Sequence, residues 1–327
     1  MASNKILVTG GAGYIGSVLI GQILDKGLSV RTIDNLSFGG RGLKPFYKNQ
    51  LFEFIKGNIC NKSDMSDAIN GLDTVIHLAA IVGDPACKKY PELAQKVNKD
   101  GSEMLYKTAL DNGVKRFVFI STCSNYGKMA DPNGFVDEDS ELNPVSHYAE
   151  LKVGFEKFLL DNKNDDIAPV ILRFSTAYGL SPRPRFDLTV NEFTKELLLN
   201  RKLDIYGEQF WRPYCHTSDL AKAILISVDA DKSKVANQAF NVGNNQENYR
   251  KKDVIELILN KLPQMKKNIS YVKKDEDPRN YRVNFDKINS MLGFETKNTV
   301  SDGIDEIIDA INKKIIDNPD DIVFRNL

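Results

Sequence analysis

The sequence has little that would tie the protein to a membrane or to nucleic acid. No stretch of its 327 residues approaches the roughly 20 consecutive apolar residues that cross a bilayer. The first residues also lack the basic and apolar regions of a signal peptide. Lys and Arg together number 44, as do Asp and Glu, so the chain is neutral. Nucleic-acid-binding proteins usually carry a basic excess on one face, so we expect neither a membrane nor a nucleic-acid partner.

Cysteine and histidine are scarce as well. The four cysteines show no CxxC spacing and the three histidines lie far apart, at positions Cys60, Cys87, Cys123, Cys215, His77, His147 and His216. This scatter argues against a disulfide framework and against a metal site. Reduced thiols are typical of a cytoplasm. We therefore expect a cytoplasmic protein that binds no metal.

Short apolar runs alternate with helical patterns in the first half of the chain. Strands are predicted at Lys5–Thr9, Val30–Asp34, Phe52–Lys56, Thr74–Ala79, Arg116–Ser121 and Pro169–Phe174. Helices are predicted at Gly13–Lys26, Asp64–Asn70, Glu92–Asn112 and Ser146–Asp161. Continuous β-branched runs between helices indicate an α/β fold with a doubly wound parallel sheet, the Rossmann arrangement.

The pattern changes after Gly179. Helices are predicted at Leu188–Leu199, Ser218–Val228, Lys252–Leu262 and Val300–Lys313, and short strands at Leu203–Tyr206 and Gln238–Val242. We expect residues 1–178 to form the Rossmann domain and residues 179–327 mainly a smaller mixed α/β lobe for the substrate. This division allows the chain to cross back to the first domain. The charged segment around Asp317–Asp321 is predicted to be a solvated tail.

A glycine-rich turn lies between the first predicted strand and the first helix. Thr9–Gly16 reads TGGAGYIG. Gly10 allows the tight turn, Gly13 lets the backbone approach a pyrophosphate, and Gly16 permits close packing of helix and strand. The helix start then offers unpaired N–H groups and the positive end of the helix dipole. This context favours a dinucleotide site.

An acidic residue follows at the expected distance. Asp34 ends the second predicted strand, where a carboxylate can accept hydrogen bonds from a ribose diol. The same carboxylate would repel a 2′-phosphate, so NAD is favoured over NADP. The alternative is a solvated turn aspartate beside Asn35.

Tyr148 and Lys152 lie one turn apart on one face of a predicted helix. A tyrosine with the ordinary pKa of about 10 needs a drop of about three, worth about 4 kcal/mol, to act as a base at neutral pH. The Lys152 ammonium and a positive nicotinamide ring could together supply this. Taken alone, such a pair is also common on helical surfaces.

The motifs together resemble the extended short-chain dehydrogenase/reductase family, in its nucleotide-sugar epimerase and dehydratase branch. The resemblance rests on TGGAGYIG, Asp34, HLAA (His77–Ala80), Asn98, the hydroxyl at the end of the fifth strand, and the Tyr148/Lys152 pair. It implies NAD as the cofactor. A weaker resemblance is to nucleotide-heptose and nucleotide-hexose 4-dehydrogenases of surface-polysaccharide synthesis, and it rests on AAIVGDPAC (Ala79–Cys87), RPRFDLTVN (Arg183–Asn191) and WRPYCH (Trp211–His216).

The resemblance also implies which residues form the site. The catalytic residues would be Thr122, Tyr148 and Lys152. The cofactor would be bound by Gly10, Gly13, Tyr14, Ile15, Gly16, Asp34, Asn35, Asn58, Ile59, Leu78, Ala79, Ala80, Asn98, Ser121, Tyr148 and Lys152. The substrate would be bound by Thr122, Ser124, Thr176, Arg185, Asn191, Arg212 and Arg279, the arginines lying in predicted loops where their forks suit a diphosphate.

Three departures from the family pattern bear on the reaction. Cys123 and Ser124 stand where 4,6-dehydratases carry an acidic pair, so we do not expect dehydration. Thr176 replaces an asparagine that many epimerases use near the diphosphate, and Asn58 replaces the aspartate at the adenine.

The sequence therefore predicts an NAD-dependent nucleotide-sugar 4-epimerase that acts on a nucleotide-diphosphate sugar through a transient 4-keto sugar. A 4-dehydrogenase that releases the keto sugar is the alternative, and a non-catalytic NAD-sensing scaffold is a minor one. The resemblance also implies a homodimer that pairs the helices Glu92–Asn112 and Ser146–Asp161 of two copies.

Overall fold

A seven-stranded parallel sheet forms the larger part of the protein. The computed structural model describes residues 5–129, 131, 134–273 and 279–326. The strand order is β10-β6-β5-β4-β1-β2-β3 and every neighbouring pair is parallel. The strands are β1 (Ile6–Thr9), β2 (Val30–Asp34), β3 (Phe52–Lys56), β4 (Thr74–His77), β5 (Arg116–Thr122), β6 (Ala168–Phe174) and β10 (Gln238–Val242). This confirms the predicted doubly wound α/β fold.

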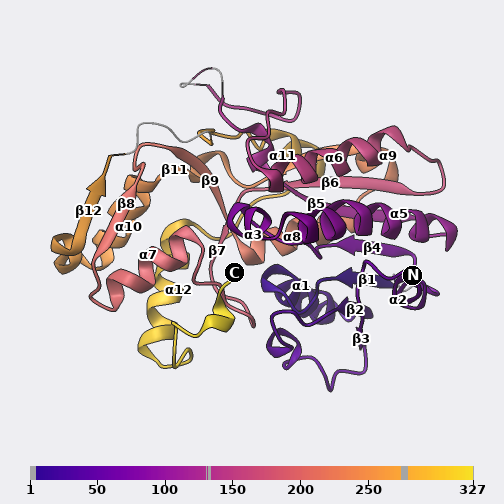
Figure 1. The fold of residues 1–327 in the computed structure, drawn as a ribbon, viewed down its shortest axis with the longest axis horizontal. Helices are drawn as coiled ribbons and strands as arrows, with labels where there is room; N and C mark the ends of the chain where they lie inside the picture. The colour runs from indigo at the N-terminus through magenta and orange to yellow at the C-terminus, as the bar shows by residue number, and fades with distance from the viewer. Residues whose placement is uncertain (1–4, 130, 132–133, 274–278, 327) are drawn as a thin grey trace.

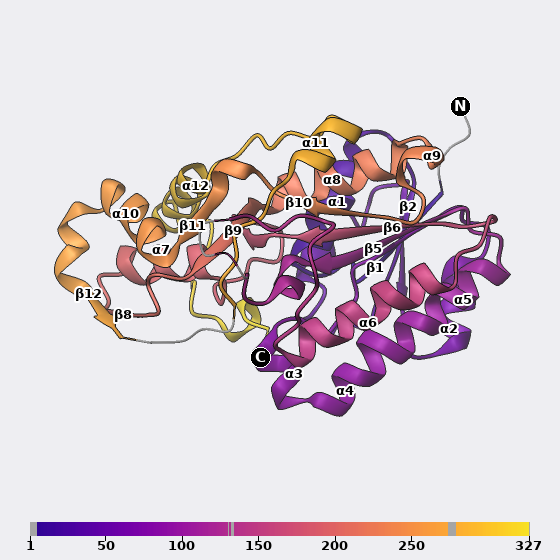
Figure 2. The same cartoon turned by 90° about the horizontal axis from the view of Figure 1, so that it is seen from above.

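Helices cover both faces of this sheet (Figure 2). One face carries α1 (Tyr14–Asp25), α8 (Thr217–Asp229), α9 (Lys232–Val235) and α11 (Asp286–Leu292). The other carries α2 (Lys62–Ile69), α3 (Asp84–Lys89), α4 (Pro91–Gln95), α5 (Ser102–Asp111) and α6 (His147–Asp161). Along β1, Ile6 and Val8 join the core on one side, whereas Leu7 joins the core on the other. Successive strand residues point to opposite faces, which is why this strand is apolar throughout.

The strand order reverses between β1 and β4. From β1 the chain proceeds to β2 and β3 in one direction, and it then returns to β4, β5 and β6 in the other. In open α/β sheets, ligands bind in the crevice at the carboxyl ends of the strands at such a reversal. The topology therefore places the site beyond Thr9, His77 and Thr122, the last residues of β1, β4 and β5.

The predicted helix Glu92–Asn112 is helical, but it is not uniform. A π-helical segment, Lys96–Gly101, lies between α4 and α5. Asn98 is buried in this segment with 2% of its surface exposed. Single π turns inside α-helices often occur at functional sites.

A smaller lobe lies beside the sheet (Figure 1). It contains a three-stranded sheet, β11-β9-β7, and a two-stranded sheet, β12-β8. Its strands are β7 (Thr176–Tyr178), β8 (Leu203–Tyr206), β9 (Trp211–His216), β11 (Asn248–Arg250) and β12 (Ile269–Val272). Its helices are α7 (Thr189–Leu198), α10 (Lys251–Lys261) and α12 (Val300–Asn312).

The lobe is not one continuous piece of chain. We expected Gln238–Val242 to belong to it, and this was wrong, because β10 pairs with β6 at the edge of the large sheet. The sequence pattern identifies the strand but not its neighbour. The chain thus crosses back to the first domain after Gly179, through α8, α9 and β10.

The segment Asp320–Asn326, which we call the strap, overlaps the end of the charged segment that we expected to be solvated, in which Asp317 and Asp320 are exposed. Asp320 accepts a hydrogen bond from Lys195 Nζ at 2.9 Å, and Phe324 is buried against Phe186 with ring centroids 5.9 Å apart. Asn326 Oδ1 accepts from Arg183 Nη1 at 2.6 Å. Figure 1 shows this yellow segment between α12 and the end of the sheet near α1.

Among the described residues, no helix is long and apolar enough to cross a bilayer.

Candidate active site

The glycine turn leaves no room for side chains. Gly10 has φ +76°, and a Cβ there would lie 2.8 Å from Ala79 N. A Cβ on Gly16 would lie 2.4 Å from the Gly10 carbonyl oxygen. Helix α1 begins after Gly13, with no side chain capping it and no acidic residue in its first turn. The first N–H groups of a helix have no partner within it, so this cradle fits a pyrophosphate.

Tyr14 and Ile15 contribute backbone N–H groups to this first turn. The Tyr14 side chain has another use, because its buried hydroxyl donates to the Gly179 carbonyl at 2.6 Å. Gly179 is the first residue after β7, so this bond joins the glycine turn to the smaller lobe. Burial raises the pKa of the Tyr14 phenol well above its usual range, which keeps it a donor.

Asp34 lies beside the glycine turn. Its Oδ2 accepts from Ala12 N at 3.0 Å and its Oδ1 from Leu36 N at 2.8 Å. Burial raises the pKa of this carboxyl, and these two N–H groups oppose the rise. Each carboxylate oxygen can accept a second hydrogen bond, so both could receive a ribose hydroxyl. The neighbouring Asn35 is exposed, and its Oδ1 accepts from Ser37 N and Oγ.

The remaining residues expected at the cofactor line the carboxyl ends of neighbouring strands. Asn58 follows β3 and is exposed; its Oδ1 accepts from Cys60 N at 2.9 Å, while Ile59 is buried. Leu78, Ala79 and Ala80 follow β4 and are half-buried. Leu78 and Ala79 lie against Gly10 of the glycine turn, and binding of the cofactor by all these residues stays a prediction.

Asn98 and Ser121 have side chains that are occupied inside the protein. The amide of Asn98 accepts from Ile81 N and donates to Ile81 O, both at 2.8 Å. Ser121 Oγ donates to Glu156 Oε1 and accepts from Asn125 Nδ2. Both side chains therefore help to hold the local structure, and their contact with the cofactor stays a prediction.

Glu156 belongs to a buried ion pair that the sequence analysis missed. Glu156 Oε2 and Arg173 Nη2 are 2.8 Å apart, with 2% and 6% of the side chains exposed. The Glu156 carboxylate raises the pKa of Arg173 against the lowering effect of burial. Because Glu156 is on α6 and Arg173 on β6, the pair fixes α6 against the sheet one turn beyond Lys152.

Tyr148 and Lys152 lie near the start of α6, which Ser146 caps by accepting from Ala149 N. Lys152 Nζ donates to the Ile120 carbonyl at 2.7 Å and lies 5.9 Å from the centre of the Tyr148 ring. Burial lowers the pKa of Lys152 to about 8, which Cys87 and Glu156 oppose. The ammonium is therefore charged at neutral pH and sits beside the phenol.

The pKa of Tyr148 is raised in the protein alone. Burial is the main cause, and the acidic groups of Cys87 and Asp84 add to it, whereas Arg185 opposes it. Lys152 does not by itself produce the lowering that the sequence suggested. A second positive charge close to the phenol is needed for base chemistry at neutral pH.

Thr122 ends β5 close to α6. Its Oγ1 is 2.6 Å from Ser124 Oγ and accepts from Ser124 N at 3.1 Å. Both residues are half-buried, so their hydroxyls form one small polar group. Cys123, between them, is buried, and its thiol donates to the Arg173 carbonyl at 3.2 Å.

The residues expected at the substrate lie on the lobe side of the site. Arg185 is held by Asp187 through two hydrogen bonds of 3.0 and 2.6 Å. Asn191 is fully buried, and its amide accepts from Gly179 N and donates to the Gly179 and Arg185 carbonyls. Asn191 therefore positions the loop that carries Arg185, and its contact with a substrate stays a prediction. Thr176 is half-buried on β7.

Arg212 lies on strand β9, and the loop that we predicted there was wrong. Its Nη1 donates to the Trp211 carbonyl at 2.6 Å, and its guanidinium lies 5.3 Å from the centre of the Tyr281 ring. In the motif WRPYCH, buried and exposed residues do not alternate, because the last four residues are all buried. That hid the strand from sequence analysis.

Arg279 joins the two lobes. Its Nη1 forms an ion pair with Asp84 Oδ2 at 2.5 Å, and Asp84 Oδ1 accepts from Ser146 Oγ at 2.6 Å. Asp84 begins α3 and lies close enough to Tyr148 to raise its pKa. The sequence analysis did not single out Asp84, although AAIVGDPAC contains it. The arginine expected at the diphosphate is thus bound to a carboxylate of the other lobe.

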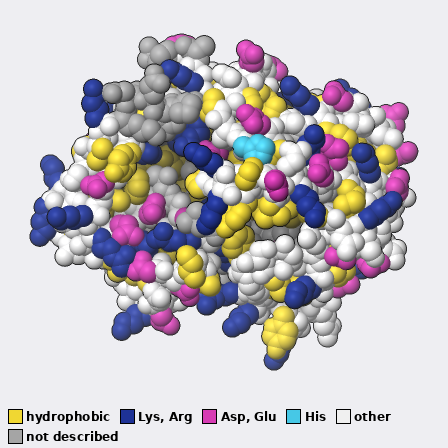
Figure 3. Space-filling model, viewed as in Figure 1, with side chains coloured by type: hydrophobic (Ala, Val, Ile, Leu, Met, Phe, Trp, Pro, Cys, Tyr) yellow, Lys and Arg dark blue, Asp and Glu magenta, His cyan; other side chains and the backbone are white. Residues whose placement is uncertain are grey.

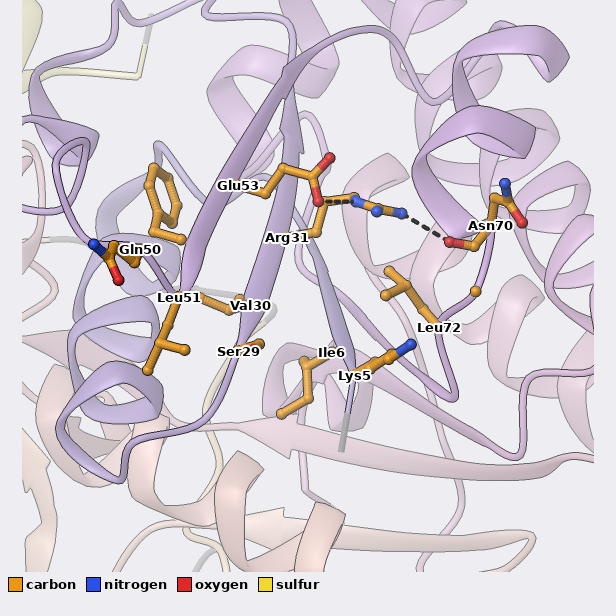
Figure 4. A pocket seen from close by; sticks show the side chains of 12 residues that line it. Lys5, Ile6, Ser29, Val30, Arg31, Gln50, Leu51, Glu53, Asn70 and Leu72 are labelled. Carbon is orange, nitrogen blue, oxygen red and sulfur yellow. Dashed lines mark hydrogen bonds and ion pairs between the residues drawn. The ribbon is translucent and has the colours of Figure 1, made fainter. Parts of the chain in front are cut away.

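Figure 3 shows a hollow between the two lobes, with Lys and Arg side chains along its border. A separate depression of about 330 Å³ lies at the opposite edge of the sheet, near Lys5, Arg31 and Asn70 (Figure 4). There Arg31 bonds Glu53 and the Asn70 carbonyl. This depression is at the amino ends of β1 and β2, away from the site.

Among the described residues, no group of three or more His, Cys, Asp and Glu could hold a metal ion.

Comparison with known proteins identifies the family. Residues 6–243 match the model of the NAD dependent epimerase/dehydratase family. The uncharacterized UDP-glucose epimerase YtcB of Bacillus subtilis (strain 168) is 35% identical over 232 residues, which cover 67% of this chain and 71% of that protein.

Solved structures agree over nearly the whole chain. The UDP-glucose 4-epimerase of Thermotoga maritima, with UDP-glucose, has a TM-score of 0.84 and 26% identity over 95% of this chain and 99% of that one. The UDP-glucuronic acid 4-epimerase of Bacillus cereus, in complex with UDP-glucuronic acid and NAD, has a TM-score of 0.84 and 27% identity over 94% and 99%. Together with the glycine cradle and Asp34, these matches show that the chain belongs to the NAD-dependent epimerase/dehydratase family and uses NAD as its cofactor.

Proposed function

We propose that the protein is a nucleotide-sugar 4-epimerase that acts through a transient 4-keto sugar. The observation that carries the proposal is the grouping of Tyr148, Lys152 and Thr122 at the carboxyl ends of β4 and β5, beside the glycine cradle. A binding scaffold has no need of a buried lysine beside a half-buried phenol, because burying that cation is costly.

Each group has a defined task in the proposed reaction. The chemistry that NAD supplies when bound is reversible acceptance of hydride from C4, together with positive charge near the phenol. Tyr148 takes the proton from the C4 hydroxyl, and the Lys152 ammonium stabilises the phenolate. The hydroxyls of Thr122 and Ser124 hold the C4 oxygen as it becomes a carbonyl.

Three arginines would bind the diphosphate of the substrate. Arg185 lies in the loop before α7, Arg212 on β9 and Arg279 in the segment after β12, and each has a planar fork that suits phosphate oxygens. Arg279 would exchange its contact with Asp84 for one with the diphosphate.

The residues after Thr122 disfavour dehydration. Elimination of water across C5–C6 needs an acid and a base beside the sugar. Burial raises the pKa of the Cys123 thiol far above its usual range, and that thiol is bonded to the Arg173 carbonyl. Ser124 has no carboxylate. These side chains support epimerisation over dehydration.

A 4-dehydrogenase that releases the keto sugar is the second candidate. It is favoured by Asp84, which belongs to the AAIVGDPAC segment and lies between Tyr148, Ser146 and Arg279. This is the segment that resembles nucleotide-sugar 4-dehydrogenases.

The test combines product stereochemistry with NADH absorbance. UDP-glucose is the first substrate, because relatives named as acting on UDP-glucose match this chain, and GDP-, CDP- and dTDP-hexoses follow. An epimerase converts a nucleotide hexose to its 4-epimer, seen by NMR, without accumulating NADH. A dehydrogenase accumulates NADH in proportion to a keto sugar. If no nucleotide hexose gives either product, the proposal is wrong.

A further inference from the structure

One buried cation near the cofactor site has no role in the reaction above. Arg183 is 2% exposed and lies in the loop between β7 and α7. Its guanidinium stacks over Phe38, with the carbon 4.5 Å from the ring centre. Phe38 belongs to the loop that follows Asp34. The guanidinium therefore faces the segment expected at the ribose of the dinucleotide.

The other end of the same loop touches the glycine turn. Gly179 precedes the loop, and its carbonyl accepts from the Tyr14 hydroxyl in the first turn of α1. Arg183 thus lies in a loop that is anchored at the pyrophosphate cradle and contacts the segment after β2. Burial and the neighbouring Arg185 lower the pKa of Arg183, and the carboxylates of Asp187 and Asp34 oppose this.

The strap holds this guanidinium in place. Arg183 Nη1 donates to Asn326 Oδ1 at 2.6 Å, and Nη2 donates to the Arg325 carbonyl at 3.1 Å. A guanidinium has five N–H donors. Its Nε is buried and, within the described part of the chain, makes no hydrogen bond. A buried donor without an acceptor is costly, so this arginine is arranged to receive an acceptor.

We propose that Arg183 is a cofactor-binding residue that donates to the pyrophosphate of NAD, and that the strap positions it for this contact. The geometric support is the stacking of the guanidinium on Phe38 after Asp34, the bond of Tyr14 to Gly179 at the start of the Arg183 loop, the anchorage of Arg183 by Asn326, and its unused Nε donor. Of the groups of NAD, the pyrophosphate is the one that attracts a guanidinium fork most strongly. The inference rests on the NAD dependence of the family and holds for either product of the proposed reaction.

The test measures cofactor binding in the absence of a sugar. Dissociation constants of NAD, ADP-ribose and adenosine are determined by calorimetry for the wild type and for the variant Arg183→Met. A control variant, Arg201→Met, removes an exposed arginine that binds the strap at Asp320, through Nη1 at 2.8 Å, but lies away from Asp34. Thermal unfolding without ligand checks that each variant is folded.

Arg183→Met is expected to weaken NAD and ADP-ribose at least tenfold. Adenosine, which has no phosphate, and Arg201→Met should each change by less than twofold. The proposal is overturned if Arg183→Met leaves the NAD constant within twofold, if adenosine is weakened as much, or if both variants weaken NAD equally. If Arg183→Met does not fold, Arg183→Lys decides: it keeps the charge but not the fork, so a loss of threefold or more for NAD supports the contact and a change below twofold refutes it.

These measurements are independent of the proposed reaction. Failure to convert any nucleotide sugar would leave the NAD constants, and hence the role of Arg183, unaffected. An unchanged NAD constant would remove that role while leaving an observed epimerase activity intact.

Discussion

Lys152 should make the stability of the protein depend on pH in a way that one substitution reveals. The lysine is 4% exposed, and burial lowers its pKa from 10.5 to about 8. A difference of about 2.5 in pKa corresponds to about 3 kcal/mol. The unfolded chain binds this proton more tightly than the native protein does. The lysine therefore destabilises the native state fully below pH 8, and this cost is lost as the pH rises toward 10.5.

The variant Lys152→Met removes this pH dependence. It also leaves the Ile120 carbonyl without its donor, at a cost of about 1 to 3 kcal/mol. The two effects oppose each other at pH 7, so the sign of the stability change at one pH is uninformative. The change with pH is informative: relative to the variant, the wild type should gain about 1 kcal/mol of unfolding free energy between pH 7 and pH 9.

The assay is urea unfolding of both proteins at several pH values, without NAD. Lys222→Met serves as the control, because Lys222 also donates to a carbonyl, that of Glu295 at 2.8 Å, but at the surface. A difference between wild type and Lys152→Met that stays constant from pH 7 to pH 9 would show that Lys152 is not a destabilised buried cation. The account in which the Lys152 ammonium stabilises the Tyr148 phenolate would then be wrong.

Three further outcomes are expected. Tyr148→Phe should lower kcat by about 10² to 10⁴-fold, as loss of a general base does, with the NAD dissociation constant unchanged; a fully active variant would refute the assignment. Gly10→Ala should cost about 1 to 3 kcal/mol of unfolding free energy and weaken NAD binding, since φ is +76° and the new Cβ would meet the Ala79 backbone at 2.8 Å; an unchanged melting temperature and NAD affinity would contradict this. A homodimer through α4, α5 and α6 should appear in light scattering, and Leu93→Asp should dissociate it, because Leu93 and Tyr90 are 45% and 44% exposed at that face; a monomeric wild type would exclude the interface.

Local patterns in the sequence were enough to assign six of the seven strands to the large sheet, all except β10. Apolar runs such as Val30–Asp34 and Phe52–Lys56 became strands with the predicted bounds. The glycine turn could be recognised because the tight turn and the close approach of neighbouring backbone require glycine at Gly10, Gly13 and Gly16. The pair Tyr148 and Lys152 could be placed on one helical face because residues four apart in a helix lie on the same face.

Side-chain partners from distant segments could not be predicted in this way. Asn98 and Asn191 have amide side chains of the kind that bind ligands, yet these amides form hydrogen bonds with the backbone at Ile81 and Gly179. Arg279 suits a phosphate, but it pairs with Asp84, 195 residues away in the chain. A polar residue's type says what it can bind, whereas only the fold decides which acceptor lies within reach.

The sequence by itself determined the alternation of strands and helices, the glycine turn and the spacing of Tyr148 and Lys152 on one helix, because each depends on spacing along a few turns of chain. Only the tertiary structure decided that β10 returns to the large sheet, that Glu156 and Arg173 fix α6, and that the strap holds Arg183. These contacts join segments far apart in the chain, and their free energy comes from burial that no local pattern records.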